Sequence, residues 1–245
     1  SNGTLTQKPR ILKQRLGGTM LATVHQQYSA PKKDPIVQLN SNNLQDGEAI
    51  PAAYAFGRPD PTTHIALSEN YSPHLCWSDA PEGTRSFALL CIDPDVPSVG
   101  DDVNQEGRTV AANLPRTDFV HWVLVDIPSS CAALSERECG EGIVPRGKQQ
   151  PHGPTGSRQG VNDYTSWFAD DPDMTGTYKG YDGPCPPWND ELLHHYIFTI
   201  YALDVDKLEV DGDFTASDVK SAMKGHIVGE ASLTGTYTNN PSVKG

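Results

Sequence analysis

The chain has 245 residues, of which 36% are hydrophobic and 20% charged, a composition that permits a packed core and argues against wholesale disorder. Its formal net charge of −12 excludes nucleic acid and anionic membranes as bulk partners, because an acidic protein repels phosphates. No segment is long and apolar enough to span a bilayer, and 22 glycines and 20 prolines favour a β-rich fold with many turns.

Residues 1–35 differ in composition from the rest of the chain. They carry one acidic residue, Asp34, against six basic ones, which are Lys8, Arg10, Lys13, Arg15, Lys32 and Lys33. This segment fits a basic arm that docks on the acidic body or on a neighbouring subunit, and it also fits a solvated extension. We expect residues 36–245 to form a single domain. The first residues hold no apolar signal core, so we expect a cytoplasmic protein, although a removed signal would leave no trace.

The predicted elements follow in chain order. Residues 53–56 and 64–67 are weak strand candidates. The segments 86–93, 119–127 and 195–203 are apolar on both faces and predict central strands. A helix is expected from Thr215, which forms a capping box with Asp218, to a stop at Gly225. The alternating segment 231–238 suits a last strand. The long polar segments 98–118 and 145–179 are expected to be loops that wall a site.

Two carboxylates lie at the end of the predicted strand 86–93: Asp93 is its last residue, and Asp95 follows two residues later. Pro94, Asp95 and Pro97 continue the chain as a turn, and a carboxylate held beside prolines loses little freedom when it engages a partner. The bonds before these prolines are candidates for cis peptides. An ordinary Asp-Pro turn would explain the same residues.

His121 lies inside an apolar strand. Alternation of side chains predicts that it shares a face with Val123 and Val125, while Trp122 points to the other face. A histidine in such a place needs a hydrogen-bond partner. It is therefore either a ligand-binding residue or a satisfied core histidine.

The stretch GYDGPCPPWNDELLHHY, residues 180–196, places a stiff loop in front of a strand. His194 and Tyr196 are expected to share a face, and His195 to point away in a structural role. Gly183 allows a backbone N–H to approach a ligand, and Pro186 keeps the loop from collapsing. Imidazolium, phenol and backbone N–H groups are donors, a set that suits phosphate oxygens, and a nearby carboxylate favours the imidazolium.

Five motifs in this order resemble the phosphatidylethanolamine-binding protein family, which includes Raf kinase inhibitor protein, and in particular its bacterial and archaeal branch. They are DPDVP (93–97), HW (121–122), GYDGPCPP (180–187), HHYIFTIYALD (194–204) and MKGHIVGEASLTGTY (223–237). The resemblance spans about residues 45–238. It implies a mostly β fold, in which a large central antiparallel-rich sheet packs on a smaller sheet, with few short helices.

The resemblance also implies a small pocket for phosphate, acetate, cacodylate or a phosphoethanolamine head group. The matching positions are Asp93, Asp95, His121, Gly183, Pro186, His194 and Tyr196. The segments 98–118 and 145–179 are long for the family and could cover or reshape this pocket. We therefore expect a binding module without cofactor or catalytic residues, which takes a small phosphate-bearing ligand and regulates a kinase or protease partner. A homodimer fits this expectation; stable membrane insertion does not.

Two enzyme hypotheses remain as alternatives. A metal-dependent hydrolase or transferase could use Asp93, His121 and His194 as ligands. A thiol enzyme could use Cys185 as nucleophile and His194 as base. The five cysteines contain no CxxC pair, so we expect no disulfide framework and a reducing compartment. The acidic segment 204–213 lacks EF-hand spacing and is expected to be a turn.

Overall fold

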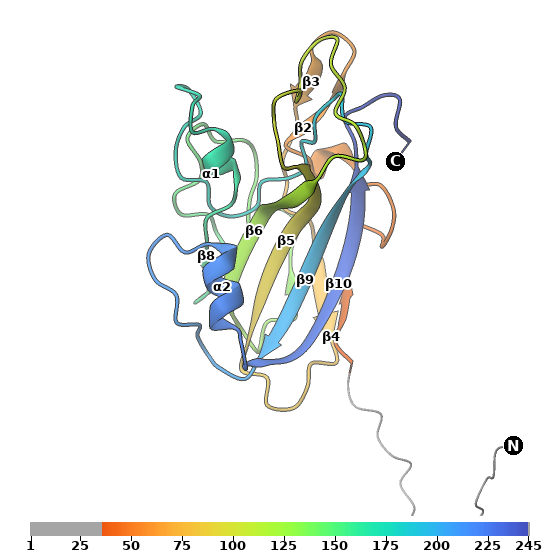
Figure 1. The fold of residues 1–245 in the computed structure, drawn as a ribbon. Coiled ribbons are helices and arrows are strands. Elements are labelled where there is room, and N and C mark those ends of the chain that lie inside the picture. The colour runs from red at the N-terminus through yellow and green to blue at the C-terminus, as the bar shows by residue number, and fades with distance from the viewer. Residues whose placement is uncertain (1–35, 245) are drawn as a thin grey trace, which may run out of the picture. The chain divides into compact units, whose positions relative to one another are not determined.

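The computed structural model describes residues 36–244, which contain short helices and a larger number of strands (Figure 1). The elements in chain order are β1 (Gln38–Asn40), η1 (Ala52–Tyr54), β2 (Gly57–Asp60), β3 (His64–Leu67), β4 (Leu75–Ser78), β5 (Ser86–Pro97), β6 (Arg116–Pro128), β7 (Ala133–Leu134), β8 (Arg158–Gln159), α1 (Tyr164–Trp167), β9 (His194–Leu203), α2 (Ala216–Ala222) and β10 (Ile227–Tyr237). The predicted basic extension over residues 1–35 lies outside the described residues.

A five-stranded antiparallel sheet forms the centre of the described part, in the order β10-β9-β5-β6-β8. A three-stranded sheet, β1-β4-β7, packs on one of its faces, and β2 and β3 pair as a separate hairpin. Figure 1 shows the long strands β6, β5, β9 and β10 side by side, with α2 beside β6. The expected mostly β fold with a large antiparallel-rich sheet, a smaller sheet and few short helices is confirmed.

Two hydrophobic cores cover the two faces of the central sheet. The first lies between the central and three-stranded sheets and includes Trp77, Phe87 and Trp122. The second lies under α2 and includes Val125 and Val219. Because both faces are covered, the central strands are nearly continuous apolar runs, which is why three of them were predictable.

The helix prediction is confirmed at α2. The hydroxyl of Thr215 accepts from the backbone N–H of Asp218, and the Asp218 carboxylate accepts from the backbone N–H of Thr215. These bonds satisfy donors that a helix start leaves without partners. Strands β3, β5, β6, β9 and β10 agree with the predicted segments to within a few residues at most ends.

Three expectations about local structure are wrong. Residues 53–56 do not form a strand, because Pro51 and Ala52 accept i→i+3 bonds from Tyr54 and Ala55 and so close a 3-10 turn. No cis peptide bond occurs between residues 36 and 244. The prediction that His121 shares a face of the sheet with Val123 and Val125 is also wrong.

His121 lies at a β-bulge. Cys91 pairs with Trp122 and the next residue, Ile92, pairs with Val120, so His121 is an extra residue on β6. A bulge of this kind interrupts the alternation of side chains and re-aims one of them. The ring of His121 therefore lies against Tyr196, on the side of the first core, while Val123 and Val125 lie in the second.

None of the helices in the described residues is both long enough and apolar enough to cross a membrane.

Candidate functional site

A cavity of about 240 Å³ lies at one end of the central sheet, where β5 ends and β6 and β9 begin. Because these strands are antiparallel neighbours, their facing ends bring together side chains that are far apart in sequence. Four buried polar side chains at the base of the cavity are Asp93, His121, His194 and Tyr196, each at most 3% exposed. All four were predicted to belong to one site.

His194 is the central charged residue of the site. Its Nδ1 donates to Oδ2 of Asp93 at 2.7 Å and its Nε2 donates to Oδ2 of Asp190 at 3.0 Å. Burial alone would lower the pKa of this imidazole, but the bonds to the two carboxylates outweigh burial and raise the pKa to about 9. His194 is therefore an imidazolium at neutral pH, and both of its N–H groups are used within the protein.

Asp190 connects His194 to Arg116. The guanidinium of Arg116 binds both oxygens of Asp190, at 2.6 and 3.1 Å, in the fork geometry that suits a carboxylate. Despite burial, the bonds from His194, Arg116 and the backbone N–H of Leu192 keep the pKa of Asp190 below its usual value. The sequence analysis missed Asp190, although its position four residues before His194 was a usable signal.

The charges around His194 cancel. Asp93 and Asp190 supply two negative charges, and His194 and Arg116 supply two positive ones. Buried charges are tolerated when they are paired in this way. The base of the cavity is consequently a polar surface with no net charge.

His121 is held by the backbone of a different segment. Its Nδ1 donates to the carbonyl oxygen of Asp182 at 2.8 Å. Burial lowers its pKa more than the nearby carboxylates raise it, so the ring is neutral at pH 7 and its Nε2 carries a lone pair. No hydrogen bond to Nε2 occurs within residues 36–244.

The backbone carbonyl that orients His121 belongs to Asp182, whose buried side-chain carboxylate accepts hydrogen bonds at both oxygens. The side chain of Asp182 accepts from Asn70 at 2.8 Å, from Lys148 at 2.7 Å and from Asn162 at 2.9 Å. These residues come from three separate parts of the chain. They fix segment 181–183 behind the cavity and with it the direction of the His121 ring.

The hydroxyl of Tyr196 lies close to the Asp93 carboxylate but makes no hydrogen bond of standard geometry to it or to another described residue, although the side chain is 1% exposed. Burial, together with the nearby Asp93 carboxylate, raises the pKa of this phenol well above its usual value. The hydroxyl is thus protonated and able to donate. Buried polar groups without partners are rare, and each one needs an explanation.

Two of the three remaining predicted positions, Asp95 and Gly183, have other roles in the structure. Asp95 accepts from the backbone N–H and ring Nδ1 of His195, at 2.9 and 2.8 Å, outside the cavity. The N–H of Gly183 already donates to Asn70, and a Cβ on Gly183 would collide with the carbonyl oxygen of Tyr54. Pro186 lines the cavity, as expected, with its carbonyl bonded to Asn239.

Both long segments contribute walls to the cavity. The first supplies Val103 and Asn104, and the second supplies Tyr164, Trp167 and Phe168. The first segment is fixed by Asn189, whose side chain bonds the backbone of residues 102, 104 and 108 at 2.8 to 3.1 Å. His152, in the second segment, does not line the cavity.

The phosphatidylethanolamine-binding protein (PEBP) family model matches residues 40–238 of this chain, a range that contains all the elements around the cavity. The chain belongs to the PEBP family. The resemblance inferred from its motifs is thereby confirmed.

Bacterial and archaeal PEBP relatives agree with this assignment. A UPF0098 protein of Methanothermobacter thermautotrophicus is 34% identical over 72% of this chain and 89% of its own length, and one of Aquifex aeolicus is 31% identical over 82% and 88%. The crystal structure of Escherichia coli YbcL, a member of the mammalian PEBP family, matches with a TM-score of 0.59 and 28% identity over 82% of this chain and 98% of that one. CT736 of Chlamydia trachomatis, a PEBP homolog, gives 0.55 and 28% over 83% and 97%.

Three features of this PEBP-family site bear on the two enzyme hypotheses. His194 has no ring nitrogen free to bind a metal, and residues 36–244 contain no cluster of three or more histidine, cysteine, aspartate or glutamate side chains arranged for one. Burial raises the pKa of the Cys185 thiol to about 12, whereas a nucleophilic cysteine needs a lowered pKa. The same two nitrogens of His194 are also unavailable to act as a base.

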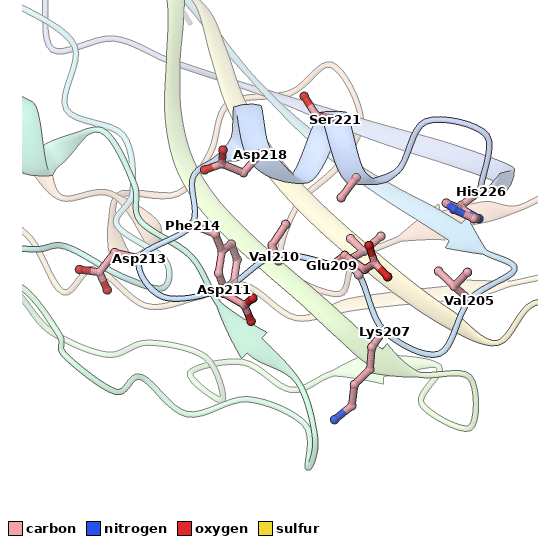
Figure 2. A pocket seen from close by; sticks show the side chains of 12 residues that line it. Val205, Lys207, Glu209, Val210, Asp211, Asp213, Phe214, Asp218, Ser221 and His226 are labelled. Carbon is pink, nitrogen blue, oxygen red and sulfur yellow. The ribbon is translucent and has the colours of Figure 1, made fainter.

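A larger hollow of about 650 Å³ lies between α2 and the loop that follows β9 (Figure 2). Its acidic side chains have structural roles where partners are seen: Asp218 caps α2, and Asp213 binds Lys179. His226, at the edge of the hollow, binds Asp204 at 2.8 Å. Five of the seven positions matched to the family's motifs line the smaller cavity instead: Asp93, His121, Pro186, His194 and Tyr196.

Proposed function

We propose that this protein is a binding module for a small oxyanion, a phosphate or a phosphoethanolamine head group, and that it has no catalytic role. The observation that carries the proposal is the buried Oη of Tyr196, which makes no hydrogen bond to the described residues, beside the ring of His121, whose Nε2 makes none there either. A buried polar atom without a partner costs free energy, and a ligand oxygen would remove that cost. The family relationship supports the class of ligand.

The geometry changes the donor set expected from the sequence. His194 and Gly183 use their N–H groups inside the protein, so they support the site without donating to the ligand. An anion therefore receives one bond from Tyr196 and a second from His121 once Nε2 is protonated. Since burial keeps the unliganded His121 neutral at pH 7, binding of a fully ionised anion takes up one proton.

This coupling predicts the direction of the pH dependence. The pKa of free His121 is below its usual value, and a bound anion raises it, so affinity should increase as pH falls from 8.0 to 6.0. The gain approaches tenfold per pH unit, about 1.4 kcal/mol, while the free ring is neutral and the bound ring is charged. Sulfate is a suitable probe because it stays fully ionised over this range.

The experiment is calorimetric titration with sulfate at pH 6.0 and 8.0, together with NMR of the histidine rings. We expect binding that is tighter at pH 6.0 and shifts the signals of His121. Tyr196→Phe should weaken sulfate binding roughly tenfold or more, the value of a hydrogen bond to a charged group. His121→Gln, which keeps a donor near Nε2 but does not titrate, should bind with little pH dependence.

The matched control is His195→Gln, because His195 is exposed and bonds Asp95 away from the cavity. This variant should bind sulfate like the wild type. Absence of binding at millimolar sulfate or O-phosphorylethanolamine at either pH would refute the proposed function.

The family also supports a wider proposal, that occupancy of this cavity regulates a kinase or protease partner. This step is an analogy, because a fold does not fix a function. We also propose a cytoplasmic location and a homodimer. The location is supported by the state of the five cysteines, which are all free thiols and so fit a reducing compartment.

A further inference from the structure

Strand β10 is an edge strand of the central sheet, and only part of its outer side is covered. β9 pairs with its inner side, and Figure 1 shows β10 outside β9. On the outer side, segment 46–50 covers Thr234 and Thr236, which each donate to it and accept from it at 2.7 to 3.0 Å. The backbone groups of these two even-numbered residues therefore point away from β9.

Two residues earlier in β10 have outward backbone groups without partners. Alternation along the strand gives Glu230 and Ser232 the same orientation as Thr234. In residues 36–244 their outward N–H and carbonyl groups make no hydrogen bond. Both residues are exposed, as expected for backbone groups that bond water. The edge thus offers two donors and two acceptors in a row, the pattern with which an added strand pairs.

Exposed apolar side chains lie near the start of this open edge. Ile227 and Val228 are 42% and 39% exposed, and Ile36 is 65% exposed. The chain beside Ile36 reaches β10, because a Cβ on Gly229 would lie 2.8 Å from the side chain of Val37. The three exposed residues are β-branched, and such side chains pack well against a neighbouring strand.

The charged side chains of this edge are all acidic. Asp46, Glu48 and Glu230 are exposed, and segments 36–50 and 227–237 contain no lysine or arginine. A residue directly opposite Glu230 on an added strand would lie on the same face of the sheet, where an opposite charge is favourable and a like charge is not. A second copy of β10 has no basic residue to place there.

We propose that the open edge of β10, residues 228–232, binds an extended segment of a partner protein in which basic and β-branched apolar residues alternate. The segment adds a further strand to the central sheet. It places a lysine or arginine opposite Glu230 and its apolar side chains on the other face, which β10 shares through Ala231 with the first core. None of these residues lines the cavity, so this site and the proposed oxyanion site stand or fall separately.

The probe is a synthetic peptide of alternating lysine and valine, KVKVKVK with blocked ends, titrated into the full chain by calorimetry and by NMR hydrogen exchange. In the protein alone, the amides of Glu230 and Ser232 should exchange quickly, and those of Ala231 and Leu233, which face β9, slowly. Saturating peptide should slow exchange at Glu230 and Ser232 roughly tenfold or more, because an added strand bonds both carbonyls and both N–H groups.

Two further peptides separate backbone pairing from charge. EVEVEVE has the same alternation and the opposite charge, and it should bind roughly tenfold more weakly or worse. KVKVKVK methylated at every backbone nitrogen keeps the charge of the probe but has no backbone donors, and it should not slow exchange at the edge. Equal binding of the methylated and unmethylated peptides would show that charge alone attracts the probe, and strand addition would be overturned.

Substitutions at Ser232 test the edge in the protein itself. Ser232→Pro removes the outward N–H without breaking a bond to β9, a position at which an edge strand tolerates proline. It should weaken binding of the probe roughly three- to tenfold. Ser232→Ala is the matched control, because it loses the hydroxyl that bonds Thr199 and keeps the N–H. This variant should bind the probe like the wild type.

A second pair of variants tests the charge. Glu230→Gln should weaken binding of the probe roughly two- to fivefold, with a smaller effect at high salt. Glu209→Gln removes an exposed charge from the hollow beside α2 and should leave the affinity unchanged. Equal effects of the two substitutions would overturn the placement of a basic residue opposite Glu230.

Three other results would overturn the proposal. One is slow exchange of Glu230 and Ser232 in the protein alone, since the edge would then be covered already, by a second copy if protection rises with protein concentration. Another is equal affinity of Ser232→Pro and Ser232→Ala for the probe. The third is no binding of KVKVKVK at millimolar concentration. If Ser232→Pro does not fold, the methylated peptide makes the same test on the unaltered protein.

Discussion

The charge of His194 is set by residues from distant parts of the chain. Asp93 ends β5, Asp190 follows the proline-rich loop and Arg116 begins β6, and together they enclose the imidazole in a neutral, buried network. Each charged group is paired with one of opposite charge, so removal of one leaves an unpaired buried charge, which typically costs 3–5 kcal/mol. We therefore regard His194 as a residue that positions Asp93 and the cavity base.

The stability of the protein should fall as pH rises through the pKa of His194. That pKa is about 9 in the folded protein and about 6.5 in an unfolded chain. The folded state thus holds the proton more tightly, the stabilisation is complete below about pH 6.5, and it is lost towards pH 9 and above. The loss is on the order of 2–3 kcal/mol, measured by urea unfolding at pH 6.5 and 9.5.

His194→Gln should be less stable at pH 6.5 and should lose much less stability between the two pH values. The control His195→Gln changes the adjacent, exposed histidine and should follow the wild type. If His194→Gln declined with pH as steeply as the wild type, the proton on His194 would not be the source of the effect.

At the scale of single elements, small irregularities aim the functional side chains. The bulge in β6 turns His121 from the second core toward Tyr196, and the docking of α1 on β6 places an aromatic wall beside it. The regular element α2 covers the opposite face of the sheet. This division separates residues that stabilise the fold from those that form the cavity.

The capping box of α2 gives a test of stability that leaves the site untouched. Thr215→Ala removes the side chain that accepts from the Asp218 N–H and should lower the free energy of unfolding by about 1 kcal/mol. Ser217→Ala, an exposed change within the same helix, should change it by less than about 0.5 kcal/mol. Sulfate affinity should stay at the wild-type value in both variants, and an equal effect of the two substitutions on stability would contradict the role of the cap.

At the scale of the whole molecule, the five cysteines differ in how deeply the fold buries them. Cys91 and Cys139 lie in the first core, and burial raises the pKa of both thiols. Cys185 packs beside the cavity with its pKa also raised. Cys76 and Cys131 are partly exposed. Because all five cysteines are free thiols, and the buried ones have raised pKa values, we interpret them as residues that pack in the protein interior and not as nucleophiles.

Alkylation of the native protein, followed by mass spectrometry, should modify Cys76 and Cys131 quickly and Cys91, Cys139 and Cys185 slowly. The thiolate is the reacting species, and burial disfavours it. In guanidinium chloride without reductant all five should react. Fast modification of Cys185 in the native state would favour the thiol-enzyme hypothesis, and fewer than five thiols after unfolding would reveal a disulfide.

The sequence by itself determined the elements with strong local signals. The runs 86–93, 119–127 and 195–203 are apolar throughout and became β5, β6 and β9, and the Thr215–Asp218 pair fixed the start of α2. The sequence also indicated the family, through short motifs in a fixed order, and it grouped Asp93, His121, His194 and Tyr196, which line one cavity in the structure. These conclusions depend on neighbouring residues or on strand ends that any antiparallel sheet brings together.

The tertiary structure alone decided what those residues do. A bulge cannot be read from alternation, so the direction of His121 became visible only in the register of β5 and β6. The partners of His194 lie up to 101 residues away in sequence, and they convert an expected ligand donor into an internally bonded ion. The aromatic wall likewise depends on contacts between segments that share no local pattern. Hydrogen bonds and packing across such distances are set by the fold as a whole, which is why composition and periodicity did not reveal them.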